Sequence, residues 1–202
     1  MVITEIKKDK LHLMRVFLND GNEVLIDKDV CNEKCLKKGM ELDGLEEIIF
    51  ESDYRRAKSR AIWYLDRMDH TEKALYDKLL RAGFKPKPCA KVIARLKEVG
   101  LLDDNRYADN YANRLIESNV SKREALQKLL LKGVSYDLAK SVLEETQTDE
   151  LSQIKNVIEK KYKNKLLAEN GVQKVYAALV RKGFSYGAVK TALNEFIEES
   201  EE

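Results

Sequence analysis

The sequence is poor in the residues from which many catalytic sites and cross-links are built. Its 202 residues include two prolines, three cysteines, two histidines and one tryptophan. Three cysteines are too few for a disulfide framework, and they indicate a reducing compartment. No apolar run approaches the roughly 18–20 residues of a membrane-spanning helix, and the start lacks the apolar stretch of a signal peptide. We therefore expect a cytoplasmic protein with no membrane contact.

The motifs of catalytic chemistry are also missing. The chain contains no GxxxxGK phosphate loop and no GxGxxG turn. His12 and His70 are far apart in the sequence, which makes them a poor metal or triad set. Cys31 and Cys35 lack a second ligand pair, so packing explains them better than zinc. The sequence thus predicts a protein that is not an enzyme and has no cofactor and no metal site.

What the sequence does contain is a repeat. Gly83, Gly133 and Gly183 lie 50 residues apart, and each lies within a similar run: ALYDKLLRAGF, EALQKLLLKGV and KVYAALVRKGF. A fixed period of this size is typical of repeat proteins. It directs the search for function toward an extended surface.

Each glycine is expected to end the middle helix of a three-helix unit, because the residue after a helix often takes a left-handed conformation. Thr71 and Ser121 are predicted to cap the middle helices, and Pro86 with Pro88 to begin a third helix. The predicted fold is mainly α: three tandem three-helix repeats that form an elongated, curved body.

The first residues follow a different pattern. The apolar runs at 12–18 and 23–27 flank Asp20-Gly21, a strong β-hairpin signal. A third strand near Val2–Ile6, a short helix around Lys28–Lys37 and a segment around Leu42–Phe50 complete a small N-terminal module. The predicted division is 1–53 for this module, 54–102 for the first repeat, 103–148 for the second and 149–202 for the third.

Positive charge is concentrated in the first repeat. Residues 54–100 carry 13 Lys and Arg against 5 Asp and Glu, whereas residues 1–53 carry 8 against 13. Such a segment can be a solvated helix face or a surface for a polyanion or an acidic protein. The candidate contact residues are Arg55, Arg56, Lys58, Arg60, Arg67, Lys73, Lys78 and Arg81.

Trp63 and Tyr64 lie within this basic segment and could stack on bases. Their spacing to Ala57 and Ala61 favours burial in the core instead.

The run from Gly100 to Ala108, GLLDDNRYA, resembles a signature of the RecX family of bacterial regulatory proteins. The stretches AIWYLDR and LYDKLLRAGF are similar to the family's first repeat, and KGFSY from Lys182 is similar to its third. The resemblance covers about residues 54–197.

This resemblance implies a protein that modulates the RecA recombinase. It implies binding to RecA and to RecA–DNA filaments, inhibition of strand exchange, ATP hydrolysis and co-protease activity, and no catalytic residues. The expected partners are RecA, its DNA filament and single- or double-stranded DNA, and the expected state is a monomer.

Two other functions remain open. Three-helix units can resemble helix-turn-helix domains, which predicts sequence-specific duplex binding without RecA. A helical scaffold without a nucleic-acid role predicts no salt-dependent affinity for DNA.

Overall fold

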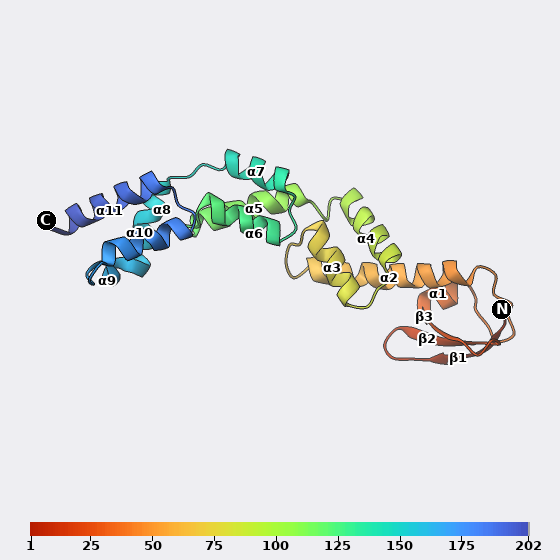
Figure 1. Cartoon of the computed structure of the whole chain (residues 1–202). Coiled ribbons are helices and arrows are strands. Elements are labelled where there is room, and N and C mark those ends of the chain that lie inside the picture. The colour runs from red at the N-terminus through yellow and green to blue at the C-terminus, as the bar shows by residue number, and fades with distance from the viewer. Residues whose placement is uncertain (202) are drawn as a thin grey trace. The chain divides into compact units, whose positions relative to one another are not determined.

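The computed structural model describes residues 1–201, and the side chains of residues 1–198. By its contacts the chain divides into two compact units, Met1–Asp103 and Asp104–Glu202. Figure 1 shows the order of the elements, with the strands confined to the first unit and helices in both.

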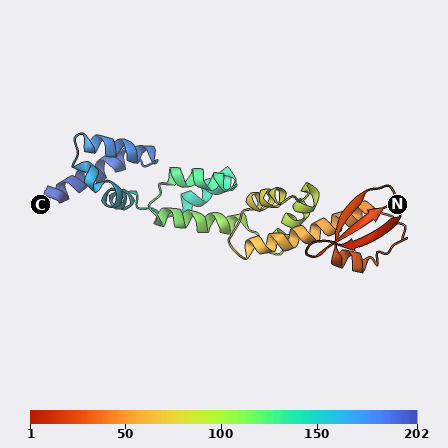
Figure 2. The ribbon, with the colours of Figure 1, turned by 90° about the horizontal axis from the view of Figure 1, so that it is seen from below.

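A three-stranded antiparallel sheet begins the first unit. Strands β1 (Ile3–Lys8), β2 (Leu13–Leu18) and β3 (Glu23–Asp27) pair in chain order. Gly21 in the β2–β3 turn has φ +84°, the left-handed conformation that glycine accepts most easily. The predicted hairpin and its third strand are confirmed. Figure 2 shows the three strands side by side.

The N-terminal module leads directly into one long helix. Helix α1 (Lys28–Glu33) is shorter than the predicted segment, and α2 runs without interruption over Leu45–Leu65. The expected break between a short segment near Phe50 and a new helix at Tyr54 is wrong. Neither glycine nor proline occurs within α2, and its buried residues follow one another at helical spacing (Ile48, Ser52, Asp53, Ala57 and Ala61).

Two further helices complete the three-helix repeat of the first unit. These are α3 (Glu72–Arg81) and α4 (Pro86–Glu98). The Thr71 hydroxyl accepts the Ala74 N–H at 3.1 Å, and Gly83 follows α3 with φ +90°, so both predicted helix signals are confirmed. The core of this repeat is apolar and buried (Ala57, Ala61, Leu75, Leu79, Cys89, Val92, Ile93, Leu96 and Leu102).

The second unit contains the other two repeats. Ser121 caps a middle helix by accepting the Glu124 N–H at 3.2 Å, as predicted, while the Glu124 carboxylate pairs with Lys128. Each repeat encloses its own hydrophobic cluster. The helices are α5 (Asp104–Glu117), α6 (Lys122–Leu131), α7 (Tyr136–Glu145), α8 (Glu150–Val157), α9 (Lys163–Leu166), α10 (Gly171–Arg181) and α11 (Tyr186–Glu201).

The first helix of the third repeat departs from the predicted pattern. A π-helical turn at Ile158–Tyr162 separates α8 from the short α9. The apolar residues Ile154, Ile158, Tyr162 and Leu166 are four apart, so in an ideal α-helix of 3.6 residues per turn they would drift around the axis. The wider turn reduces this drift and keeps Tyr162 and Leu166 against the cluster that includes Ile158.

The fold is therefore mainly α, with repeated three-helix units and a small N-terminal β-sheet, as the sequence predicts. Within the described residues, no helix is both long enough and apolar enough to cross a membrane.

Candidate interaction surface

The C-terminal part of α2 presents an exposed tryptophan between two arginines. The Trp63 side chain is 42% exposed. The Arg67 guanidinium carbon lies 3.5 Å from the centre of the indole ring, and that of Arg60 lies 5.2 Å from it. These distances are within the range of cation–π attraction. Arg67 also donates a hydrogen bond to the Trp63 carbonyl at 3.1 Å, which helps hold its side chain near the ring.

Three further side chains extend this group toward α3. The Tyr64 ring meets the edge of Trp63 with centroids 5.3 Å apart, and His70 with centroids 6.3 Å apart. The Lys78 ammonium lies 4.4 Å from the Tyr64 ring centre and 3.2 Å from the His70 Nε2. We call Arg60, Trp63, Tyr64, Arg67, His70 and Lys78 the Trp63 cluster.

The position of Trp63 corrects the prediction that it is buried. Ala57 and Ala61 are fully buried on α2, and Trp63 stands two residues beyond Ala61. Two residues turn a helix by about 200°, so this side chain lies almost opposite that of Ala61. Tyr64 is half-buried and packs against the repeat's core, as expected. The helical spacing of Trp63 from the two buried alanines therefore predicts its exposure.

The structure separates the predicted residues Arg55 and Arg56 from this cluster. Arg55 donates hydrogen bonds to both carboxylate oxygens of Glu33 and one at 3.3 Å to Glu51. The hydrogen bond to Glu33 raises the pKa of Arg55. Arg56 pairs with Asp53 at 3.4 Å. These ion pairs within the chain already neutralise both arginines, so they have little free charge for a partner.

The other predicted residues are not part of the Trp63 cluster. Arg81 follows Lys78 by three residues on α3, about 60° around the helix, and its guanidinium donates to the Asp77 carbonyl at 3.2 Å. Lys78 is offset from Lys73 by five residues, about 140° around the helix. Lys58 is two residues from Arg60 and so points away from it along α2. Of the eight candidates, the structure brings together Arg60, Arg67 and Lys78.

The Trp63 cluster combines planar rings with cationic groups. Aromatic faces stack on nucleic-acid bases, and arginine and lysine pair with phosphates or with acidic side chains. Such a surface has groups suited to contact with an anionic partner.

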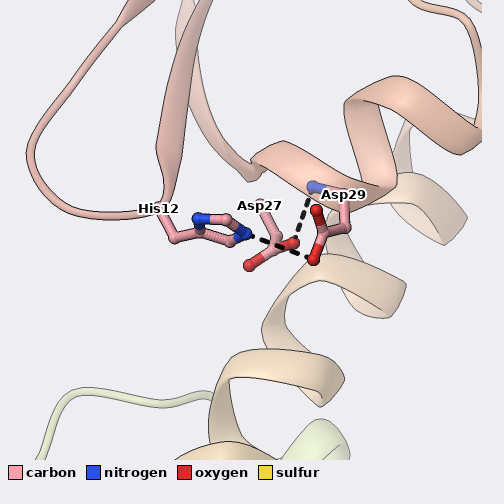
Figure 3. Close-up of side chains that lie close together, drawn as sticks. All are labelled: His12, Asp27 and Asp29. Carbon is pink, nitrogen blue, oxygen red and sulfur yellow. Dashed lines mark hydrogen bonds and ion pairs between the residues drawn. The ribbon is translucent and has the colours of Figure 1, made fainter.

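One group of metal-ligating side chains was not predicted from the sequence. One ligand atom from each of His12, Asp27 and Asp29 lies within 4.8 Å of the others. Figure 3 shows His12 approaching Asp29, whose separation is 3.2 Å, and Asp27 accepting the Asp29 N–H at the start of α1. Pairing of Leu13 with Asp27 brings these distant residues together, which no spacing in the sequence indicates. Helix capping and one side-chain hydrogen bond account for this arrangement.

Two of the three cysteine thiols are buried. Burial, together with the negative charge of Asp27, raises the pKa of Cys31 to about 11, and burial raises that of Cys89. Packing is therefore confirmed for Cys31. Cys35 is exposed beyond the end of α1, so the packing role predicted for it is wrong.

Two segments of the chain match models of known three-helix domains. Residues 57–96 match the description "RecX, first three-helix domain", and residues 148–193 match "RecX, third three-helix domain". A protein of Clostridium tetani named "Regulatory protein RecX" is 32% identical over 96% of this chain and 94% of its own length. The chain belongs to the RecX family.

Other RecX relatives are similar in sequence over nearly the whole chain. The "Regulatory protein RecX" of Bacillus subtilis is 31% identical, with 99% of this chain and 79% of the relative covered. The equivalent protein of Streptococcus gordonii is 30% identical, with 100% and 80% covered. The names describe these RecX proteins as regulators.

Solved RecX structures share the fold. One, described as the crystal structure of regulatory protein RecX, has a TM-score of 0.69 at 22% identity, covering 96% of this chain and 98% of that one. RecX from Lactobacillus salivarius has a TM-score of 0.62 at 23% identity, covering 71% and 96%. The three-helix repeats are therefore a RecX architecture.

Proposed function

We propose that this chain is a non-catalytic regulator that binds RecA and RecA–DNA filaments as a monomer and inhibits the recombinase, ATPase and co-protease activities of RecA. Membership of the RecX family is the observation that carries the proposal. A RecA partner agrees with the cytoplasmic location expected from the sequence.

The Trp63 cluster is the proposed contact within the first unit. Arg60 and Arg67 lie against an indole that is 42% exposed, although an indole in a monomeric domain is usually buried, and Lys78 lies against the neighbouring Tyr64 ring. A RecA–DNA filament offers phosphates, bases and acidic side chains, each of which such a surface can bind. Arg60 and Arg67 are expected to contribute most, because both lie over Trp63 and no ion pair with a described residue neutralises them.

Co-sedimentation with RecA filaments on single-stranded DNA tests this contact. The variant Arg60→Gln/Arg67→Gln removes two charges from the Trp63 cluster. Loss of two such contacts at about 1 kcal/mol each lowers the affinity roughly 30-fold. Trp63→Ala is expected to weaken binding as well, because it removes the ring on which both guanidiniums lie.

The chain offers a matched control. Lys58→Gln/Lys73→Gln removes the same charge from the same repeat, because Lys58 points away from Arg60 along α2 and Lys73 lies about 140° from Lys78 around α3. This control should bind like the unmodified chain, and far-UV circular dichroism should be the same for all variants. If both double variants lose affinity equally, only the total charge matters and the proposed contact is wrong.

A further inference from the structure

A narrow polar cleft lies within the second unit, where its two three-helix repeats meet. It encloses about 230 Å³ between the end of α5, helix α6, helix α8 with the π-helical turn, and the end of α10. Four lysines line it: Lys128 from α6, Lys160 and Lys161 from the π-helical turn, and Lys182 after α10. Two glutamates, Glu117 and Glu124, also line it.

The charges of this cleft do not cancel. Lys128 and Glu124 form an ion pair at 2.9 Å, which removes one charge of each sign. Among the described residues, no ion pair or hydrogen bond engages the ammonium groups of Lys160, Lys161 and Lys182 or the carboxylate of Glu117. The cleft therefore carries an excess of two positive charges.

Neighbouring lysines on the same segment behave differently. Lys155 pairs with Glu195 at 3.0 Å, and Lys163 pairs with Glu159 at 2.7 Å. Lys165 lies over the Tyr162 ring at 5.5 Å. The structure thus supplies partners for the lysines outside the cleft and leaves Lys160 and Lys161 without one. The composition does not indicate which of these lysines are paired, because residues 149–202 carry nine charges of each sign.

The walls of the cleft are held in place by contacts between the repeats. The Gln153 amide donates to the Ile116 carbonyl at 2.8 Å, and the Ser121 hydroxyl donates to the Lys182 carbonyl at 2.5 Å. The Asn156 amide donates to the Asn119 side chain at 3.3 Å, and both residues line the cleft. The π-helical turn keeps Tyr162 on the core side and leaves Lys160 and Lys161 exposed. Such turns occur frequently at functional sites.

We propose that this cleft binds the sugar–phosphate backbone of a nucleic-acid strand through Lys160, Lys161 and Lys182. Lysine ammonium groups pair with phosphates as point charges and carry no base specificity. Lys160 and Lys161 are exposed and Lys182 is half-buried, so they can follow successive phosphates along a strand rather than enclose one free ion. This site lies in the second unit, is separate from the Trp63 cluster, and goes beyond the proposed regulation of RecA.

Binding of a fluorescent single-stranded oligothymidylate, measured by anisotropy over a series of salt concentrations and without RecA, tests this site. Each phosphate contact contributes about 0.7 to the slope of log K against log salt for a single strand, so Lys160→Gln/Lys161→Gln should reduce the slope by about 1.4. Lys160→Arg/Lys161→Arg keeps the charge and should retain the slope. Because RecA is absent, failure here leaves the proposed RecA regulation untouched.

The matched control is Lys163→Gln/Lys165→Gln, which removes two lysines just outside the cleft. It should leave the slope unchanged, and an equal loss in both variants would overturn the proposed site.

Inorganic phosphate should displace the strand no better than chloride at the same ionic strength, and better displacement would identify a free-phosphate site instead. Polyglutamate that displaces the strand at lower charge concentration than unlabelled oligothymidylate would identify an acidic protein as the partner.

Discussion

A methyl group added at Gly183 should destabilise the chain more than the same methyl group added at Gly83. Both glycines end the middle helix of a repeat, with φ +91° and φ +90°. At Gly183 an alanine Cβ would lie 2.8 Å from both the Arg123 Cβ and the Ser121 Oγ. At Gly83 it would meet no atom within 4 Å. The two substitutions therefore share the backbone cost and differ in the steric one.

The magnitudes follow from these contacts. A non-glycine residue in the left-handed region costs about 1–2 kcal/mol, which applies to both variants. Overpacking adds about 1–3 kcal/mol at Gly183 alone. Ser121 cannot easily move aside, because its hydroxyl accepts the Glu124 N–H and donates to the Lys182 carbonyl. We expect a loss of about 2–5 kcal/mol for Gly183→Ala and about 1–2 kcal/mol for Gly83→Ala.

Urea unfolding followed by far-UV circular dichroism measures this difference, with each variant compared with the unmodified chain. A lower midpoint at an unchanged m-value reports lost stability. Equal losses in the two variants would falsify the close approach of the Gly183 turn to the start of α6. That result would also weaken the inferred cleft, since the same turn supplies Lys182.

Two further predictions concern single side chains. Iodoacetamide should label Cys35 in the native chain at neutral pH and leave Cys31 and Cys89 unlabelled, because both are buried and burial raises the pKa of each of these two thiols, that of Cys31 to about 11. Rapid native labelling at all three positions, measured by mass spectrometry, would contradict this. Ser121→Ala should lower the free energy of unfolding by roughly 1–2 kcal/mol, because it removes a helix cap and the hydrogen bond to the Lys182 carbonyl. Ser141→Ala is the control, since Ser141 is exposed within a helix, and it should leave the urea midpoint nearly unchanged.

Local sequence signals were enough to predict the repeats. The glycines at 83, 133 and 183, the capping residues Thr71 and Ser121, and Pro86 at a helix start all act within one turn of the chain. Asp20-Gly21 acts in the same way for the hairpin. Such features depend on the conformation of a few neighbouring residues, so their positions in the sequence are sufficient.

Which charged side chains are left unpaired on the surface depends on tertiary contacts, and no local sequence pattern encodes these contacts. Arg55 belongs to the basic segment by sequence, yet Glu33 lies 22 residues earlier and neutralises it. The pairing of Lys155 with Glu195 and the freedom of Lys160 follow equally from tertiary packing. Trp63 is different, because its exposure follows from its helical offset from Ala61, and a helical projection would have shown it.

The ATPase activity of RecA on single-stranded DNA, titrated with this chain, tests the proposed inhibition of RecA most directly. We predict inhibition at substoichiometric amounts relative to RecA, and weaker inhibition by Arg60→Gln/Arg67→Gln than by Lys58→Gln/Lys73→Gln. An unchanged ATPase rate at a molar excess of the chain, together with tight binding to a particular duplex sequence, would contradict the proposed inhibition of RecA. That result would favour a helix-turn-helix regulator.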